Sequence, residues 1–399
     1  MKILMVCNIF PPSIGGIQKS NYEIAKGINL KINDLTVVVI NAGVEERGFD
    51  SKQNFNIIRT GPGSISWQAS LLNLPLMTTS ILFSAPKIIE TIKEFNPDKI
   101  IFADYATRLL LGLVPVEKIT DAEIITITSV PKTGDMVGSQ FLGRLRGAVL
   151  KRCYKKSDKV AFVSKSTENE LRRYYGNEIF DKKETDIIYR NVDDKFSKES
   201  VDKDKLRDLK EKYDIDDNKK VVLSVSRIKK KKGIDKTLEA LKMYRDESND
   251  DFHYIIVGDG DYLPKIKEII KELELEEHVT TTGYVDFDDV IHYYDLCDIF
   301  ILPSRRKISE SFGRVFAEAS ARKKPVIGGK VGGVKEVIDD GVTGYLVNPR
   351  NIDEIYRKIK KLLEDKELRT QMGKKGREKV ENTFTFEILK ERLENVLNE

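Results

Sequence analysis

Short apolar runs that alternate with longer amphipathic segments are the feature that most limits the fold of this chain. Helical periodicity between these runs, as in Lys265–Leu273, predicts helices that cover a sheet on both sides. Continuous apolar runs are typical of parallel strands buried on both faces. The predicted strands, each rich in Val, Ile or Thr, are Ile3–Cys7, Thr36–Ile40, Lys99–Phe102, Ile124–Thr128, Lys159–Val163, Val221–Val225, His253–Val257, Val279–Thr282, Ile299–Leu302 and Pro325–Ile327.

The alternation is interrupted once, by the charged segment 193–220. This segment has no strand signal, and its pattern predicts a linker followed by one solvated helix. A chain of 399 residues is long for one core, because single cores stop growing at roughly 250–300 residues. We therefore predict an α/β protein of two doubly wound, Rossmann-like domains that face a cleft. In such sheets a ligand binds beyond the carboxyl ends of the strands.

Composition indicates a protein that stays in a reducing compartment. Cys7, Cys153 and Cys297 lie far apart, which excludes a disulfide framework and an obvious zinc site. The N-terminal MKILMVCNIFPP has too short an apolar run for a signal peptide and is read as a buried strand. No apolar run reaches the roughly 18 residues of a membrane span. We expect a cytoplasmic protein, either free or peripheral on the inner face of the membrane.

Two basic residues follow the first strand of the second predicted domain. Arg227 comes just after Val221–Val225, and Lys232 precedes Gly233 and the next helix. A guanidinium and an ammonium group at the mouth of a strand–helix unit predict a clamp for a diphosphate. The alternative is a solvated lysine loop, which suits residues 229–231 best.

The stretch ISESFGRVFAEAS, residues 308–320, places a carboxylate beside the start of a helix. Glu310 lies in a polar loop, and the helix begins at Phe312-Gly313. The free N–H groups and the positive dipole end of this helix predict a second anion site that needs no side chain.

Glu318 lies inside that same helix, which is otherwise small and apolar. Arg314 and Arg322 lie four residues to either side. From spacing alone, the favoured interpretation is the middle of a surface row of ion pairs. The alternative is a ligand contact.

Glycine pairs also follow predicted strands. Gly258 and Gly260 come after His253–Val257, but the third glycine of the dinucleotide fingerprint is missing. A tight turn is the favoured role, with its backbone along the ligand crevice. Gly15-Gly16 follow the first strand and either let a ligand approach the backbone closely or form a simple turn.

The segment 143–173 is strongly basic, with ten Lys and Arg against three acidic residues. Its helix interleaves leucine and valine with the charges, which fits contact with an anionic membrane surface. From composition alone, the favoured interpretation is a solvated helix face. Together with residues 65–83, which include Trp67, the segment suggests a lipid-linked or membrane-surface acceptor, and a sugar phosphate or a soluble glycan is the alternative. The small net charge of +4 gives no reason to expect a nucleic-acid partner.

Together these segments resemble the family-4 glycosyltransferases, retaining enzymes of the GT-B fold. The resemblance covers most of the chain and is closest in its second half. The stretches that carry it are FPPSIGGIQ, VAFVSKSTENEL, NVDDKF, VSRIKKKKGID, YIIVGDGD, TTGYVDFDDV, CDIFILPSRRKISESFGRVFAEASARKKPVIGGKVGGVKEVIDDGVTGYLV and ENTFTFE.

The resemblance gives the candidate residues specific roles. The family motif is two glutamates separated by seven residues, which Glu310 and Glu318 match. It implies that Glu310 contacts hydroxyls of the transferred sugar and that Glu318 accepts hydrogen bonds from the ribose of the nucleotide. Arg227 and Lys232 match the basic pair that grips the donor diphosphate. Arg227, Lys232 and Glu310 are thus the predicted catalytic residues.

Backbone groups complete the predicted donor site. Phe312 and Gly313 would donate N–H groups to the diphosphate, Gly16 would lie near the reacting centre, and Gly258 would line the crevice. The implied domains are an acceptor-binding domain over 1–195 and a nucleotide-sugar-binding domain over 196–383. Residues 384–399 would form a helix that packs back on the first domain.

The sequence departs from the family in its first domain. Family members commonly carry a histidine at the end of the strand around IITITSV, but residues 128–130 are Thr-Ser-Val here, and the first domain contains no histidine. Asp104 is the nearest polar replacement that we can propose.

The implied reaction moves a sugar from a nucleotide diphosphate donor to a hydroxyl acceptor with retention at the anomeric carbon. Cations and the helix N-terminus would stabilise the leaving diphosphate, whose oxygen would take the acceptor's proton. We expect neither a metal ion nor a cofactor. Two alternatives remain open: a non-catalytic nucleotide-sugar-binding protein and a nucleotide-sugar epimerase of the same fold.

Overall fold

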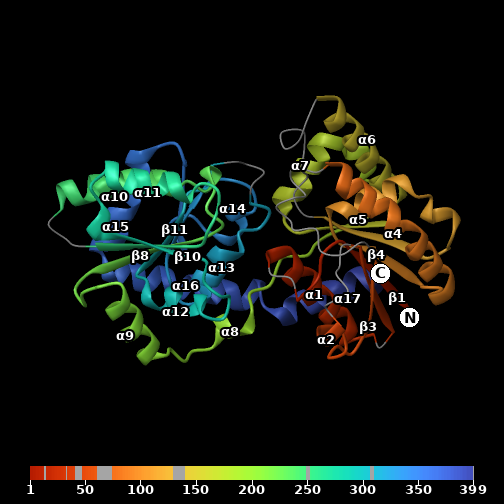
Figure 1. Cartoon of the computed structure of the whole chain (residues 1–399), viewed down its shortest axis with the longest axis horizontal. Coiled ribbons are helices and arrows are strands. Elements are labelled where there is room, and N and C mark those ends of the chain that lie inside the picture. The colour runs from red at the N-terminus through yellow and green to blue at the C-terminus, as the bar shows by residue number, and fades with distance from the viewer. Residues whose placement is uncertain are drawn as a thin grey trace. The chain divides into compact units, whose positions relative to one another are not determined.

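The computed structural model describes residues 1–12, 15–32, 34–40, 47–60, 74–128, 140–248, 252–305 and 310–398. The chain forms two compact units (Figure 1). Residues 1–190 and 386–399 make up the first domain, and residues 191–385 make up the second. The chain thus changes domain a few residues away from the predicted boundaries.

The first domain is built on a parallel sheet. Its strands are β1 (Ile3–Cys7), β2 (Leu35–Val39), β3 (Asn56–Arg59), β4 (Lys99–Phe102), β5 (Glu123–Thr128), β6 (Lys159–Phe162) and β7 (Glu184–Ile187). Within the described residues they lie in the order β3-β2-β1-β4-β5-β6-β7, and every neighbouring pair is parallel. The order reverses between β1 and β4, which is the doubly wound pattern.

Helices cover both faces of this sheet because successive strand residues point to opposite sides. Leu4 and Val6 face one core, which also takes side chains from α4 (Leu74–Phe95), α5 (Tyr105–Leu113), α6 (Gln140–Lys156) and α7 (Lys165–Tyr175). Ile3 and Met5 face the other core, which α1 (Gly16–Asn29) and α17 (Phe386–Asn398) complete. The shorter helices are α2 (Arg47–Asp50), η2 (Val116–Lys118) and η3 (Asn177–Ile179).

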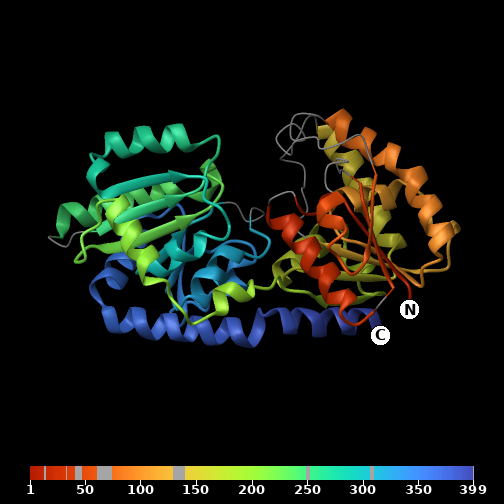
Figure 2. The ribbon, with the colours of Figure 1, turned by 60° about the horizontal axis from the view of Figure 1, so that its bottom comes forward.

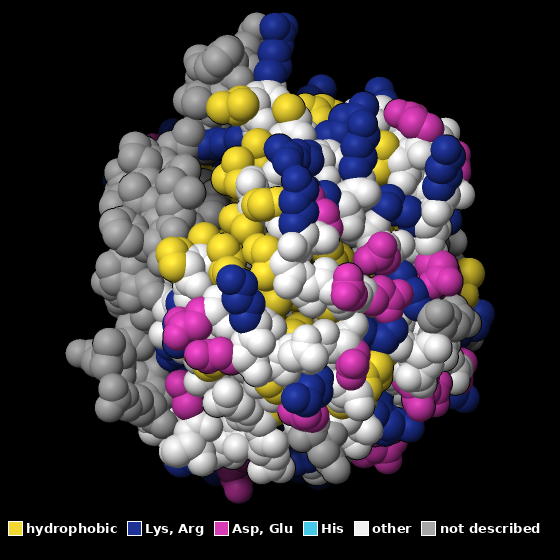
Figure 3. Space-filling view, turned by 90° about the vertical axis from the view of Figure 1, so that its right-hand side faces the viewer, with side chains coloured by type: hydrophobic (Ala, Val, Ile, Leu, Met, Phe, Trp, Pro, Cys, Tyr) yellow, Lys and Arg dark blue, Asp and Glu magenta, His cyan; other side chains and the backbone are white. Residues whose placement is uncertain are grey.

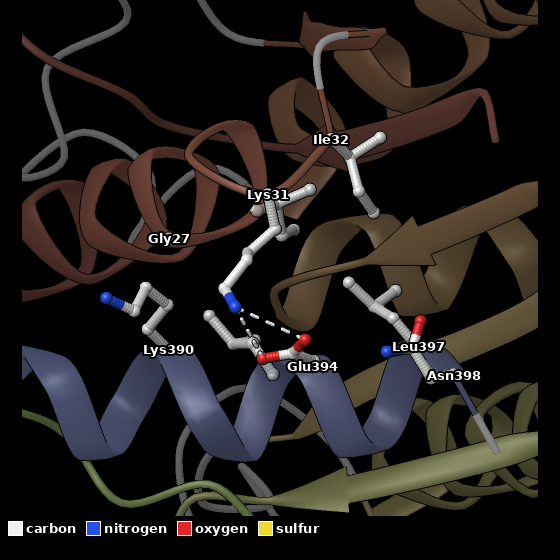
Figure 4. A pocket seen from close by; sticks show the side chains of 9 residues that line it. Gly27, Lys31, Ile32, Lys390, Glu394, Leu397 and Asn398 are labelled. Carbon is white, nitrogen blue, oxygen red and sulfur yellow. Dashed lines mark hydrogen bonds and ion pairs between the residues drawn. The ribbon is translucent and has the colours of Figure 1, made fainter.

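The closing helix α17 is part of the first domain although it comes from the far end of the chain (Figure 2). Its Leu389 and Leu393 are buried beside α1. Lys31, which follows α1, forms a 3.0 Å ion pair with Glu394 of α17 (Figure 4). The pocket in that view is small, about 110 Å³, and lies at the C-terminal end of α1. It is therefore far from the strand ends at which this fold binds ligands.

The second domain repeats the same architecture. Its strands are β8 (Lys220–Val225), β9 (Phe252–Val257), β10 (Val279–Gly283), β11 (Ile299–Leu302), β12 (Val326–Gly329) and β13 (Gly344–Val347). In the described part of the chain they form a parallel sheet in the order β10-β9-β8-β11-β12-β13. The order reverses between β8 and β11.

Two groups of helices sandwich this second sheet (Figure 1). One face carries α10 (Ile234–Glu247), α11 (Leu263–Glu272) and α15 (Ile352–Glu364), and the other carries α12 (Val290–Leu296), α13 (Arg314–Ala321) and α16 (Lys366–Thr383). The shorter helices are α8 (Asp194–Ser197), η4 (Lys230–Lys232), η5 (Glu276–His278) and α14 (Val334–Val337).

The charged segment 193–220 contains α8 and a second helix, α9 (Lys203–Lys212), which buries none of its residues. The predicted solvated helix is α9, but the predicted linker before it also forms the short helix α8, whose Phe196 is buried. The segment is nevertheless held in place, because buried Arg322 and Arg377 donate to backbone carbonyls around Phe196.

Candidate active site

The predicted site residues of the second domain gather at the point where its strand order reverses. β8 and β11 are adjacent, with Ile299 opposite Val222. Arg227 and Lys232 follow β8, and Glu310 follows β11. Because parallel strands end at the same edge, both loops leave the sheet side by side at its ligand-binding edge.

Close backbone contacts hold the loop after β8 against the loop after β11. Gly233 has φ +79°, and a Cβ at this position would overlap the carbonyl oxygen of Pro303. The Arg305 N–H donates to the carbonyl of Lys231 at 2.8 Å, and the Arg305 side chain pairs with Asp235. Glycine is therefore needed at position 233, and it sets the place of the preceding Lys232.

Lys232 and Glu310 form an ion pair at this junction. The same carboxylate oxygen, Oε1, accepts a 2.9 Å hydrogen bond from Ser304. Both side chains are largely buried, at 15% and 11% exposure, so the attraction is stronger than on an open surface. Among the described residues, Oε2 of Glu310 accepts no hydrogen bond. The carboxylate is thus fixed through one oxygen, and the other can accept ligand hydroxyls.

Glu318 is buried, with 5% of its surface exposed. Its Oε2 accepts a 2.9 Å hydrogen bond from Tyr294 of α12. Arg322 points elsewhere, since its guanidinium pairs with Asp295 at 2.5 Å. The interpretation favoured by spacing, a solvated row of ion pairs with Glu318 at its middle, is therefore wrong.

Helix α13 begins at the same edge of the sheet. Gly313 has φ +90°, a left-handed conformation that favours glycine, and within the described residues no side chain caps the helix. The neighbouring Phe312 is buried against Phe384, with ring centroids 5.1 Å apart. Uncapped N–H groups at a helix N-terminus favour an anion, so the geometry is compatible with the predicted backbone contacts to a diphosphate.

Arg227 is exposed, and it makes no hydrogen bond or ion pair with any described residue. A guanidinium without a protein partner at the ligand edge of the sheet can bind an anion without first breaking another interaction.

Gly258 has a structural role. Its N–H donates to the Gly283 carbonyl at 2.8 Å, and a Cβ there would overlap the carbonyl oxygen of Ser226. These contacts explain the glycine without a ligand. Its predicted place along the donor site stays a prediction.

In the first domain, Gly16 opens α1 directly after the loop that follows β1. A Cβ added to Gly16 would meet nothing within 4 Å. The described residues thus give no packing reason for a glycine here, which leaves room for a ligand close to the backbone. Its role near the reacting centre stays a prediction.

Asp104, the candidate replacement for the missing histidine, has a structural role. It caps α5, where its Oδ1 accepts the Thr107 N–H at 3.3 Å. Its Oδ2 accepts the Asn8 N–H at 2.5 Å and Asn21 Nδ2 at 3.4 Å. Burial raises the pKa of Asp104, and these donors oppose that shift. The carboxylate therefore joins the ends of β1 and β4.

Sequence reasoning missed a buried cation beside this strand end. Arg108 of α5 is 1% exposed and donates to the hydroxyls of Thr128 and Tyr154. Thr128 occupies the start of the region in which family members commonly carry a histidine, while residues 129 and 130 lie outside the described part. A signal was present, because Arg108 is the one charged residue of the apolar helix YATRLLLGL, and buried charges need partners.

Taken together, the second domain offers cations, an uncapped helix N-terminus and two buried carboxylates. The cations and the helix can hold a diphosphate, and the carboxylates can accept hydroxyls on either side of it. A nucleoside diphosphate sugar has this order of groups.

Comparisons with known proteins point to the same class of protein. The family model described as Glycosyl transferases group 1 matches residues 206–379. A GDP-mannose-dependent alpha-(1-6)-phosphatidylinositol monomannoside mannosyltransferase of Mycolicibacterium smegmatis is 30% identical over 381 residues, which cover 94% of this chain and 92% of that protein.

Solved structures resemble the whole chain. Sucrose-phosphate synthase from Thermosynechococcus elongatus superposes with a TM-score of 0.81 at 18% identity and covers 100% of this chain and 98% of its own. A glycosyltransferase from Rickettsia africae reaches a TM-score of 0.77 at 23% identity, with coverage of 100% and 99%.

The fold and the site define a glycosyltransferase of the GT-B class. Within that class, the chain belongs to the family of group 1 glycosyl transferases, and the resemblance found in the sequence is confirmed.

The close approach at Gly233 gives a testable result. We predict that Gly233→Ala lowers the free energy of unfolding of the second domain by at least ~2 kcal/mol more than Gly283→Ala does. Gly283 is a matched control, because its φ of +71° imposes similar backbone strain but nothing lies within 4 Å of an added Cβ. Urea denaturation followed by circular dichroism measures both. Equal losses would show that the contact with Pro303 does not matter.

Proposed function

We propose that this glycosyltransferase moves a sugar from a nucleoside diphosphate sugar to a hydroxyl of a lipid-linked acceptor, with retention and without a metal ion. The observation that carries the proposal is the Lys232–Glu310–Ser304 contact at the start of α13. It presents one carboxylate oxygen to a sugar beside a helix N-terminus that suits a diphosphate.

The relatives guide the choice of substrates. The Mycolicibacterium smegmatis protein is named as dependent on GDP-mannose and as acting on a phosphatidylinositol monomannoside. Its similarity extends over almost the full length of both chains. We therefore propose a glycolipid with a free sugar hydroxyl as the acceptor class and GDP-mannose as the first donor to test.

The proposed chemistry follows from charge. As the bond between sugar and diphosphate breaks, negative charge grows on the leaving phosphate, and Arg227, Lys232 and the N–H groups at Gly313 stabilise it. The acceptor oxygen attacks from the face that the phosphate leaves, and the phosphate oxygen takes its proton. Because attack and departure take place on the same face of the sugar, the new glycosidic bond keeps the anomeric configuration of the old one.

Two features support this route over its alternatives. A double displacement needs a carboxylate nucleophile, whereas Glu310 already has a binding role in this proposal: Oε1 is held by Lys232 and Ser304, and Oε2 accepts sugar hydroxyls. A metal ion would neutralise the diphosphate, but the cations and helix dipole can supply that neutralisation themselves.

The exposed side chains on one face of α6 support the proposal that the protein binds a membrane surface. Arg144, Arg152 and Lys155 are exposed beside Leu145, and with the described residues they make no hydrogen bond or ion pair through their side chains. Figure 3 likewise shows a face of the molecule where hydrophobic side chains gather among Lys and Arg. Exposed cations beside an exposed apolar side chain are attracted to anionic lipid. None of the described helices has the length and apolar character that crossing a bilayer needs.

The direct test is turnover with a panel of nucleotide sugars, beginning with GDP-mannose, and a glycolipid acceptor. We expect free nucleoside diphosphate and a product with retained configuration, at the same rate with and without EDTA. Loss of turnover in EDTA that a divalent ion restores would contradict the metal-free mechanism. Donor binding without release of nucleoside diphosphate for any acceptor would contradict transfer itself.

Arg227 provides the sharpest single-residue prediction. A hydrogen bond to a charged group contributes ~1.5–3 kcal/mol, so Arg227→Ala should lower kcat/KM by about one to two decades. Thermal stability should not change, because Arg227 has no partner among the described residues. Lys230→Ala, an exposed cation in the same loop, is the control and should stay within about twofold of wild type. If both variants lower kcat/KM equally, Arg227 contributes only to the positive charge of the loop and is not a specific ligand of the diphosphate.

Cosedimentation with vesicles that contain an anionic phospholipid tests the membrane surface. We expect the triple variant R144Q/R152Q/K155Q to bind about a hundredfold more weakly at low salt, since each surface cation contributes ~1 kcal/mol. The control is K236Q/K242Q/K265Q, which removes three lysines that are already paired with carboxylates. Equal binding by both triple variants, or none by wild type, would remove the membrane proposal.

A further inference from the structure

We propose that Tyr294 is a positioning residue that sets the selectivity of this site for a ribonucleotide over a deoxyribonucleotide. It does so by holding the Glu318 carboxylate in the orientation that accepts ribose hydroxyls. The inference rests on the proposed function, because it assumes that Glu318 meets the ribose of the donor. Its evidence is a separate one, namely the packing of α12 against α13.

The Tyr294 hydroxyl is directed at Glu318 by its surroundings. The ring is fully buried, and its centroid lies 5.7 Å from that of Phe196 and 5.7 Å from that of Phe300. Two aromatic neighbours and complete burial leave the ring few alternative positions. The hydroxyl then donates to Oε2 of Glu318 at 2.9 Å.

Tyr294 remains the donor in this bond throughout the working pH range. Burial raises its pKa well above the ordinary value for tyrosine, and the neighbouring Glu318 carboxylate raises it further. A hydroxyl that keeps its proton stabilises a negative oxygen beside it. An ionised carboxylate is an acceptor only, which is the form needed to receive two ribose hydroxyls.

A second contact, next in sequence, fixes the two helices to each other. Asp295 pairs with Arg322 at 2.5 Å, and both side chains are 4% exposed. Tyr294 and Asp295 thus hold α13 at two points one helical turn apart, Glu318 and Arg322. Rotation of Glu318 away from its acceptor orientation would break the tyrosine bond inside a core, where an unmade hydrogen bond is costly.

Tyr293 is a matched control on the same helix. It is 4% exposed, and its hydroxyl is hydrogen-bonded at 2.8 Å to that of Tyr213, which follows α9. Removing either hydroxyl deletes one hydrogen bond from one buried tyrosine. Only Tyr294, however, is bonded to a predicted ligand-binding residue.

The experiment measures binding of GDP and UDP, and of their 2′-deoxy forms, by calorimetry to the full chain. We expect wild type and Y293F to prefer the ribonucleotide by about tenfold or more, and Y294F to prefer it by no more than about threefold. If Tyr294 had a merely structural role, Y294F would weaken binding of the ribonucleotide and the deoxyribonucleotide equally, and the ratio of their affinities would not change. In the Glu318→Gln background, Y294F should no longer alter the ratio.

The outcomes separate this inference from the proposed function. If wild type binds nucleoside diphosphates and Y294F keeps the wild-type ratio, the inference alone is overturned. If wild type binds none of them, the proposed function fails and the inference falls with it. If Y294F does not fold, a crystal structure of wild type with GDP or UDP tests the inference instead. A Glu318 carboxylate that contacts both Tyr294 and the ribose supports the inference, and a ribose bound away from Glu318 overturns it.

Discussion

The ion pair between Lys232 and Glu310 is the interaction on which the rest of the site depends. It joins the loops that follow β8 and β11, the two strands at which the sheet order reverses. Ser304 completes it through the same carboxylate oxygen. The pair keeps a cation and a carboxylate ready beside the N-terminus of α13 before any ligand arrives, and this preorganisation is what stabilises developing charge most effectively.

The backbone makes this pair possible. Gly233 lets one loop touch the carbonyl of Pro303, and the Gly333 N–H donates to the Glu310 carbonyl at 2.9 Å. Behind α13, Tyr294 and Asp295 hold the helix that carries Glu318. The site is thus a set of loops fixed to one another at the edge of the sheet, in which Arg227 is exposed while Glu310 and Glu318 are buried.

Sequence patterns revealed most of this fold but missed β3, β7 and β13, which are edge strands. β3 and β7 are partly exposed and carry polar residues, so they lack the apolar run of a strand buried on both faces. β13 is fully buried, so this reason does not apply to it. The candidate site was found through residue types and a family motif. Spacing could not give the burial of Glu318, because its neighbour Tyr294 comes from another helix. Arg108 was missed for the same reason, since its partners Thr128 and Tyr154 are distant in sequence.

One measurement tests the central claim most directly, a crystal structure of the full chain with an intact, non-hydrolysable nucleoside diphosphate sugar. The account predicts the diphosphate at the N-terminus of α13 with Arg227 and Lys232 as ligands, and a sugar hydroxyl on Oε2 of Glu310 while Ser304 stays on Oε1. A diphosphate bound away from α13, or a Glu310 carboxylate turned from the sugar, would contradict it.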